Sequence, residues 1–216
     1  MAIRFGLDRL PLLILPATVS FPRRKSMFTG LSLAVALSAS HPATGMTPRV
    51  EPSFVKAAKF KRGINVLGYD PYWTDSSKAR FKWRHFREIR QAGFDHVRIN
   101  LFAFKHMDSS GTLDPAWLAK LDAAVMAARK AGLAVIIDEH DFDDCSTNVV
   151  ACEKRLSAFW SQLGRRYRRQ PDSVAFELLN EPHGALDATW GSLMPKILGI
   201  VRRDNPNRLV VIGPTH

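Results

Sequence analysis

The chain has 216 residues, of which 46% are hydrophobic and 24% are charged, a balance that is typical of a folded globular protein and excludes a wholly disordered one. Its formal net charge of +11 raises the question of a nucleic-acid or other anionic partner. The basic residues are spread along the sequence, however, and the densest group, RRYRR at 165–169, falls at an expected helix end, where the backbone dipole favours cations. Since the sequence has no zinc-finger spacing, RNA-binding signature or phosphate-binding glycine loop, we expect no nucleic-acid partner.

The first 45 residues differ in character from the remainder. FPRRKSM at 21–27 is basic, FTGLSLAVALSA at 28–39 is apolar, and small residues follow, which is the order found in a secretory signal. The apolar run is too short to span a bilayer comfortably. We therefore expect residues 1–45 to be a targeting segment, signal-like at about 21–40, and residues 46–60 to be a linker. The processed protein is then expected to be secreted or periplasmic, with no stable membrane span.

Strand-like apolar runs alternate with helical patterns from residue 61 onward. The expected strands are GINVLG (63–68), HVRINLF (96–102), LAVIID (133–138), SVAFELL (173–179) and RLVVIG (208–213). The expected helices lie between them, over Ser76–Ala92, from Asp114-Pro115 to Gly132, over Glu153–Gln170, and through Trp190 to Val201. Pro195 is expected to kink the last helix or to begin it anew.

Five strands separated by helices predict repeated βα units and a parallel sheet. A doubly wound dinucleotide-binding sheet needs a glycine fingerprint after its first strand, and GINVLGYDPYW has two glycines at a different spacing. A (β/α)8 TIM barrel instead carries its chemistry at the carboxyl ends of its strands. Polar side chains gather at those ends here, namely Arg98, Asn100, Asp138, His140, Asn180, Glu181 and His216. The sequence therefore predicts an α/β fold in which residues 61–216 form a partial TIM-barrel catalytic domain, with about five of the eight βα units.

The alternation of side chains along a strand groups some of these polar residues. Asp138 and His140 share one face of the third strand, and Glu177 shares a face of the fourth with Glu181 until the turn begins. Polar groups that point into a barrel are costly unless they form a network. An internal hydrogen-bonding role and a catalytic role are equally consistent with Glu177 and Asp138.

Cys145 and Cys152 are the only cysteines, and they stand in the loop-like stretch DDCSTNVVAC. Two cysteines with no nearby pair of histidines do not make a metal site. In an exported protein they are expected to close a small disulfide loop, the alternative being two free, buried thiols.

The segment FELLNEPHG at 176–184 raises a further question, because an apolar strand ends in an acid beside apolar neighbours. Together with GINVLGYDPYW, FDHVRINLF and IIDEHDF upstream, this LLNEPH resembles glycoside hydrolase family 5, the cellulase-type retaining glycosidases. The resemblance extends from about Lys61 to His216, and GPTH at its end is similar to the fifth-strand segment of that family.

The resemblance implies a two-carboxylate mechanism, in which one acid protonates the leaving oxygen while a second carboxylate attacks the anomeric carbon. It assigns Glu181 as the acid/base, Asn180 as the neighbour that binds the sugar 2-hydroxyl, Arg98 as the support of the nucleophile, and His140 as a histidine of the substrate cleft. Sugar-binding residues are expected among those that follow strand ends, namely Tyr72, Trp73, Phe104, His106 and His216. The substrate is expected to be a β-linked polysaccharide or oligosaccharide, with no cofactor and no metal.

The family pattern continues beyond the fifth strand, and its nucleophilic glutamate follows the seventh. Glu139 is expected to face away from His140, so no carboxylate at a strand end replaces that nucleophile. We therefore expect a piece of the barrel that is inactive alone, either as part of a β-glycosidase or as a catalytically inactive fragment that retains sugar binding. A basic-surface interaction protein is a further alternative, and the sequence does not separate glucan from mannan as substrate.

Overall fold

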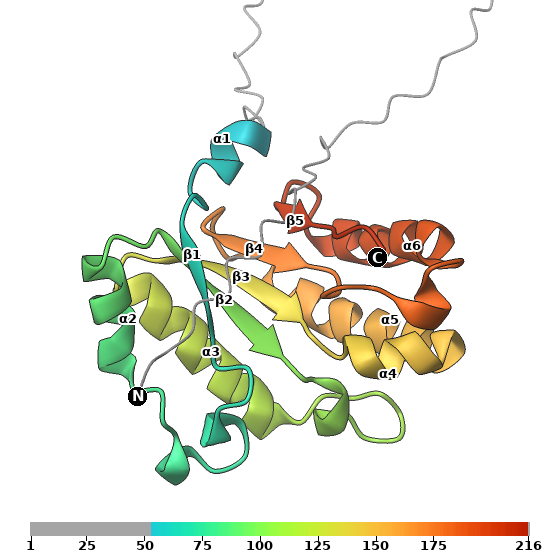
Figure 1. Ribbon diagram of the computed structural model, residues 1–216, viewed down its shortest axis with the longest axis horizontal. Coiled ribbons are helices and arrows are strands. Elements are labelled where there is room, and N and C mark those ends of the chain that lie inside the picture. Colours follow the sequence, from blue (N-terminus) through green and yellow to red (C-terminus); the bar gives the residue numbers. More distant parts are fainter. Residues whose placement is uncertain (1–52, 216) are drawn as a thin grey trace, which may run out of the picture.

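A computed structural model describes residues 53–215, so the expected signal segment, residues 46–52 of the expected linker and His216 lie outside the described residues. Five parallel strands form one sheet: β1 (Gly63–Val66), β2 (His96–Leu101), β3 (Ala134–Glu139), β4 (Val174–Glu177) and β5 (Val210–Val211). All five expected strands are therefore confirmed. The strands follow one another across the sheet in chain order (Figure 1). A doubly wound sheet reverses its strand order, whereas this order is that of an incomplete (β/α) barrel.

One helix precedes β1, and the others lie between successive strands. They are α1 (Ser53–Ala57), α2 (Trp83–Gln91), α3 (Pro115–Lys130), α4 (Phe142–Thr147), α5 (Val149–Tyr167) and α6 (Trp190–Asp204). Four 3-10 turns accompany them: η1 (Pro71–Trp73), η2 (Ser76–Lys78), η3 (Phe104–His106) and η4 (Gly184–Leu186). Helix α1 falls within the range that was expected to be a linker.

Two helices begin at other residues than expected, and a third continues through a proline. The helix expected from Ser76 begins at Trp83, because Asp75 instead caps the separate turn η2 by accepting from the Ser77 amide. Helix α5 begins at Val149, earlier than expected, and the Asn148 side chain caps it. Helix α6 runs through Pro195 without a new start. Pro195 has no amide proton, so the Gly191 carbonyl loses its helical partner. Gly191 is exposed, and water can bind its carbonyl instead.

The main core lies between the sheet and the helices. Alternate strand residues point toward the helices, and Val97, Ile99, Val135, Ile137 and Phe176 are fully buried there. The opposite face of the sheet points into the barrel interior, where a smaller apolar cluster forms from Ile136, Ala175 and Leu209.

The segment before β1 closes the amino end of the interior. Ala57 and Phe60 pack on the smaller apolar cluster, and Phe60 contacts the ring of His96 edge-on at 5.5 Å. That ring occupies the space beside Gly63, where an added Cβ would lie 2.0 Å from His96 Nε2. The buried Lys56 donates to the Asn207 carbonyl at 2.7 Å and to Asp172 at 3.2 Å. Helix α1 is thus tied to the loops at the amino edge of the sheet.

Arg208 joins α5, β4 and α6 at the same edge. Its guanidinium is buried and donates to the backbone carbonyls of Tyr167, Gln170, Pro171 and Val174 and to Asn205 Oδ1, at 2.7–3.1 Å. All of its donor nitrogens are therefore engaged, so that the carbonyls at the end of α5 have a protein partner instead of water.

Cys145 and Cys152 are bonded to each other, with an Sγ–Sγ distance of 2.02 Å. The stretch that holds them was expected to be a loop, but it forms a corner between two helices. Cys145 lies on α4, and Cys152 lies in the first turn of α5. Both residues are buried. The bond therefore fixes the short α4 against α5, beside the carboxyl end of β3.

Glu139 occupies an unusual place for a carboxyl group, because it points from β3 toward the helices and is fully buried. It faces away from the barrel interior, as expected. Its Oε2 accepts from the Asp141 amide at 3.0 Å, while Asp141 Oδ2 accepts from the Phe104 amide at 2.7 Å. Burial raises the pKa of Glu139 well above its usual range, and the neighbouring Asp141 carboxylate raises it further.

None of the helices described over residues 53–215 is both long enough and apolar enough to cross a membrane.

We predict that exported protein contains the Cys145–Cys152 disulfide and that its loss lowers the stability of the fold by about 2 kcal/mol, as expected when so short a loop is closed. Mass spectrometry of unreduced protein treated with an alkylating reagent checks the bond, and urea unfolding of the Cys145→Ala/Cys152→Ala double variant checks the stability. Recovery of both thiols alkylated from exported protein would contradict the prediction.

We also predict that Glu139 makes the fold less stable as the pH rises. A carboxyl group whose pKa is raised in the folded state stabilises the fold below the pKa of the unfolded chain and loses that contribution as the pH rises through the folded-state value. Each pKa unit of difference corresponds to about 1.4 kcal/mol. Glu139→Gln keeps the acceptor for the Asp141 amide and has no proton to lose, so its free energy of unfolding should fall less than that of the parent chain between acidic and neutral pH.

The control is Glu153→Gln, which removes a partly exposed carboxylate on α5. Urea unfolding at several pH values measures all three proteins. Parallel curves for the parent chain and Glu139→Gln would show that Glu139 does not carry the effect.

Candidate functional site

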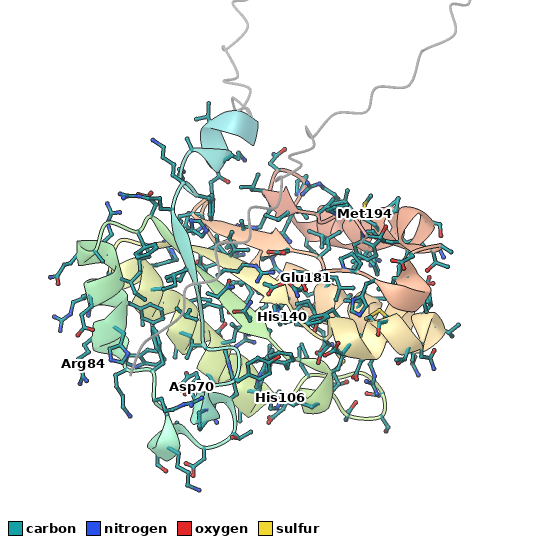
Figure 2. All side chains as sticks on the ribbon, in the orientation of Figure 1. Asp70, Arg84, His106, His140, Glu181 and Met194 are labelled. Atoms are coloured by element: carbon teal, nitrogen blue, oxygen red, sulfur yellow. A yellow bond between two sulfur atoms is a disulfide. The ribbon has the colours of Figure 1, made fainter. Side chains whose placement is uncertain are left out.

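The polar side chains predicted at the strand ends meet at the carboxyl edge of the sheet. The register of the sheet sets Asn100 of β2, Asp138 of β3 and Glu177 of β4 side by side in one row that points into the barrel interior. Arg98 lies one inward-facing position below this row. Figure 2 labels His140 and Glu181 at the same edge of the sheet.

Arg98 is the hub of these contacts. Its Nε and Nη2 donate to the two carboxylate oxygens of Glu177, both at 2.7 Å. Nη2 also donates to Asn180 Oδ1 at 2.8 Å and lies 3.1 Å from Asp138 Oδ2. Nη1 donates to Asn65 Oδ1 at 3.3 Å. One guanidinium therefore links side chains from β1, β2, β3, β4 and the segment after β4.

Asp138 orients a second group of side chains. Its carboxylate has no exposed surface, and its Oδ2 accepts from Asn100 Nδ2 at 2.8 Å and from His140 Nδ1 at 2.6 Å. Because a carboxylate can only accept, the proton of a neutral His140 is placed on Nδ1. Nε2 is then the ring nitrogen available to a ligand.

The charges of this cluster compensate one another. Burial raises the pKa of Glu177, and the Asp138 carboxylate adds to the increase, while the hydrogen bonds and charge of Arg98 oppose it. Burial by itself would lower the pKa of Arg98, but its hydrogen bonds to Glu177 and the charges of Asp138 and Glu177 raise it. The guanidinium thus stays charged in a site where an unpaired ion would be costly.

Glu181 stands beyond the cluster, four residues past the end of β4. Its side chain is exposed, whereas Asn180 and Pro182 on either side are buried. The Asn180 amide donates to the Glu139 carbonyl at 2.9 Å, which continues the sheet pairing into this segment. Glu181 itself has a φ of 36°, a left-handed conformation that is uncommon for a residue other than glycine. Buried neighbours on both sides hold this strained residue at the edge of the sheet.

The structure brings four of the predicted residues, Arg98, His140, Asn180 and Glu181, to one edge of the sheet. Arg98 and Asn180 are in direct contact, and Asp138 joins Arg98 to His140. The charge of Glu181 also contributes to the raised pKa of Arg98, after the larger contributions of Glu177 and Asp138.

Tyr72 and Trp73 lie elsewhere, which corrects the expectation that they face a sugar. Both side chains are buried, and their polar atoms have partners within the protein. The Tyr72 hydroxyl donates to the Lys120 carbonyl of α3 at 2.8 Å, and the Trp73 ring nitrogen donates to the Leu67 carbonyl. Burial raises the pKa of Tyr72 to about 12. These two rings pack turn η1 against α3.

Two further predicted sugar-binding residues are engaged in packing. Phe104 is buried, with Arg155 above its ring, and the half-buried His106 stacks on Trp117 at a centroid distance of 5.3 Å. Burial lowers the pKa of His106. His216 lies outside the described residues.

A row of aromatic rings runs along the carboxyl edge, and of its members only His140 was predicted from the sequence. Neighbouring centroids are 4.7–5.7 Å apart in the order Tyr69, Phe102, His140, Phe142 and His183. Tyr69 is 78% exposed. A sequence signal for these residues existed, because Phe102 directly follows β2 and Phe142 follows β3 by three residues. Such rings offer a surface on which a pyranose ring can stack.

Comparison with known proteins agrees with this geometry. Residues 58–216 match the family model described as Cellulase (glycosyl hydrolase family 5). Endoglucanase H of Acetivibrio thermocellus is 29% identical over 173 residues, which cover 77% of this chain and 19% of that protein. Cellodextrinase A of Ruminococcus flavefaciens is 27% identical over 177 residues, which cover 75% of this chain and 52% of that protein.

Among solved structures, endoglucanase Cel5A from the hyperthermophile Thermotoga maritima matches with a TM-score of 0.70 and 28% identity, over 76% of this chain and 54% of that one. The chain thus spans about half the length of the cellodextrinase and of Cel5A, and about a fifth of endoglucanase H. The family match covers most of the chain and includes every strand of the sheet, so this chain belongs to the cellulase family, glycosyl hydrolase family 5.

Proposed function

We propose that this chain supplies the acid/base side of a retaining glycosidase site that cleaves β-linked glucan, with Glu181 as the catalytic acid/base. The observation that carries the proposal is the pairing of an exposed Glu181 with Asn180, whose amide oxygen is held by Arg98 at 2.8 Å. A fixed oxygen leaves the Asn180 Nδ2 protons free to donate to a sugar hydroxyl, which positions the scissile bond beside Glu181.

In the first step, the Glu181 carboxylic acid donates its proton to the glycosidic oxygen as the bond from that oxygen to the anomeric carbon breaks. A second carboxylate, about 5–5.5 Å away in retaining enzymes, forms the new bond to the anomeric carbon. In the second step, the Glu181 carboxylate takes a proton from water, whose oxygen then displaces the second carboxylate. An exposed position suits a group that must exchange a proton with both the substrate and water.

We propose that the attacking carboxylate is not Glu177 or Asp138. Both oxygens of Glu177 accept from Arg98, and Asp138 is fully buried while its Oδ2 binds Asn100 and His140. Neither group can reach an anomeric carbon without breaking a charged, buried network, which is costly. These two carboxylates are positioning residues, which hold Arg98, His140 and Asn180 in place.

The names of similar proteins support a β-linked glucan as the substrate class. The curated relatives include endoglucanases and a cellodextrinase, and Cel5A of Thermotoga maritima has been solved with cellobiose and with mannotriose. The row from Tyr69 to His183 is suited to stacking on either sugar. We therefore place glucan first and mannan second as the polymer that this chain contacts.

Export is a further part of the proposal. The basic and apolar run at about 21–40 has the order of a secretory signal, and a polymer substrate requires an enzyme outside the cell. The Cys145–Cys152 bond is compatible with an oxidising compartment.

In a protein extended to the complete eight-stranded barrel, Glu181→Gln should slow the hydrolysis of a cello-oligosaccharide by about 100-fold or more, since general acid catalysis contributes that much. Aryl cellobiosides with a good leaving group should be less affected in the first step, because their leaving group needs little protonation. Steady-state and burst kinetics on both substrates measure the difference.

Glu153→Gln is the matched control and should leave both rates unchanged, because Glu153 lies on the outer helix α5, where it pairs with Lys196. Small, equal losses on both substrates for Glu181→Gln would remove Glu181 from the acid role.

The 216-residue chain alone should release no reducing sugar from a soluble β-glucan, because Glu181 without an attacking carboxylate completes neither step. An assay of the purified chain with carboxymethylcellulose measures this, and affinity electrophoresis in the same polymer measures binding. Binding without turnover would favour the alternative of an inactive sugar-binding fragment. Turnover by the monomer would show that a carboxylate of this chain acts as the nucleophile.

A further inference from the structure

Exposed cations gather at the amino end of the described barrel segment. The helices return antiparallel to the strands, so their carboxyl-terminal ends gather at the amino edge of the sheet (Figure 1), opposite the edge at which Figure 2 labels Glu181. The carboxyl edge carries charges of both signs, with the exposed acids Asp108, Asp143, Asp144 and Asp187 and the exposed cations Lys78, Arg80, Lys82 and Lys105. The amino edge carries exposed cations from three separate segments: Lys59, Lys61, Arg129, Arg165, Arg168 and Arg169. We call these six residues the amino-edge face.

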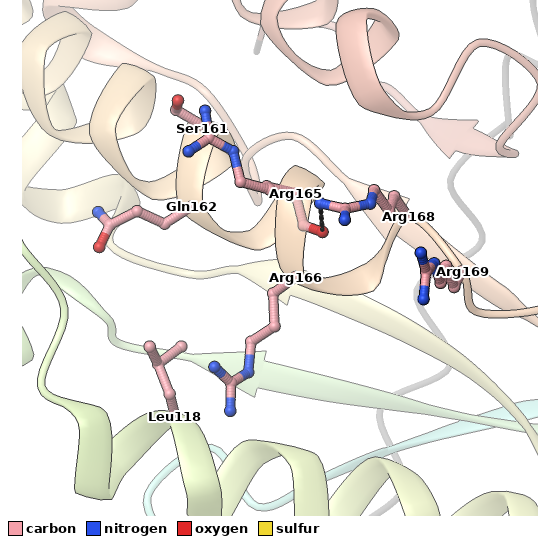
Figure 3. Close-up of a pocket in the computed structure, with 7 residues that line it drawn as sticks. All are labelled: Leu118, Ser161, Gln162, Arg165, Arg166, Arg168 and Arg169. Carbon is pink, nitrogen blue, oxygen red and sulfur yellow. Dashed lines mark hydrogen bonds between the residues drawn. The ribbon is translucent and has the colours of Figure 1, made fainter.

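The surface around these cations is hollowed. A groove of about 580 Å³ runs between α3 and α5, lined by Leu118, Ser161 and Gln162 together with the arginines at the end of α5 (Figure 3). A second hollow, of about 390 Å³, is lined by Lys59, Lys61, Arg90 and Arg129 among others. The amino-edge face therefore presents cations around two recesses instead of on one convex helix.

The arginines at the end of α5 are not needed to complete the helix. Arg208 already binds the carbonyls of Tyr167 and Gln170. In the described part of the chain, the only bond from these exposed arginines to the backbone is from Arg168 to the Arg165 carbonyl, at 3.4 Å. No carboxylate within residues 53–215 forms an ion pair with Arg165, Arg168 or Arg169, whereas Arg166 beside them is paired with Asp122. These like charges repel one another, and an anionic partner would relieve that repulsion.

We propose that the amino-edge face docks on an anionic phospholipid surface. Its cations come from the segment before β1 and from the ends of α3 and α5, so they form a broad face that a flat membrane can contact at once, instead of a single narrow slot. In the precursor, before a signal segment is removed, the route of the chain supports the same partner. The 52 residues before the described part precede α1, which lies at this edge, and they contain the basic FPRRKSM followed by the apolar FTGLSLAVALSA.

Docking in this orientation turns the carboxyl edge, with Glu181 and the aromatic row, away from the lipid. A membrane-bound molecule would then offer its sugar-binding edge to a polymer in the surrounding solution. The attraction falls off within about 10 Å at moderate ionic strength, so it acts only when the amino-edge face is close to the headgroups.

Flotation of the full chain with lipid vesicles tests the proposal, because vesicle-bound protein rises in a density gradient while aggregated protein sinks. Vesicles of phosphatidylcholine with about one-third phosphatidylglycerol are compared with vesicles of phosphatidylcholine alone. The neutral vesicles report any binding by the apolar residues 28–39. Binding to the anionic vesicles should be stronger than binding to the neutral ones and should weaken with added salt. In the variant Arg165→Gln/Arg168→Gln/Arg169→Gln, the affinity for anionic vesicles should fall by about 100-fold, or roughly fivefold per charge removed.

The control Lys78→Gln/Arg84→Gln/Lys154→Gln removes the same charge from exposed positions away from the amino-edge face and should bind like the parent chain. The variant Arg165→Lys/Arg168→Lys/Arg169→Lys should also bind, since it keeps the charge, and it distinguishes lost charge from lost folding. Equal binding to neutral and anionic vesicles, or equal losses in the two glutamine variants, would overturn the proposal. Retention on heparin that depends on the same arginines, without flotation on anionic vesicles, would overturn it in favour of a soluble polyanion. Hydrolytic activity does not enter the measurement, so the proposed function is tested separately.

Discussion

The ion pair between Arg98 and Glu177 is the interaction on which the candidate site depends. It joins β2 to β4 across β3, and the same guanidinium reaches Asp138 and Asn180. Without Arg98, the carboxylates of Glu177 and Asp138 would lie side by side with no guanidinium to compensate their charge, which is costly in a buried site. Without Glu177, the guanidinium would lose the planar, two-oxygen partner that fixes its orientation. The position of Asn180, beside Glu181, therefore rests on a salt bridge inside the sheet.

Much of the fold could be predicted from the sequence, because its strands are short, largely apolar runs and most of its helices end close to a glycine or proline. The parallel sheet and the choice of a barrel followed from those runs and from the polar residues at their ends. The start of α2 could not be predicted, because the segment before it is organised by one carboxylate: Asp70 accepts from the amides of Tyr72, Arg80 and Phe81. Such a loop leaves no periodic pattern in the sequence.

The candidate site could be predicted in part. The period of a strand placed Asp138 and His140 on one face, and the structure brings them into contact. The partner of Arg98 could not be read from the sequence, since 79 positions separate it from Glu177. Tyr72 and Trp73 were misplaced for a related reason. They follow a strand end, but the chain folds back there, and Tyr72 bonds to a residue 48 positions later. Position after a strand predicts the edge at which a residue lies, but not whether its ring faces solvent or the core.

The bond from Lys56 to the Asn207 carbonyl has a consequence for how the chain reaches its final state. It connects residues 151 positions apart, so the first described helix and the loop before the last strand must both be present before it can form. During synthesis, Lys56 cannot form this bond until the four strand–helix units before Asn207 have been made. The amino end of the barrel interior stays open to water until then. Closure of this end is thus a late event, which couples the order of folding to the direction in which the chain is made.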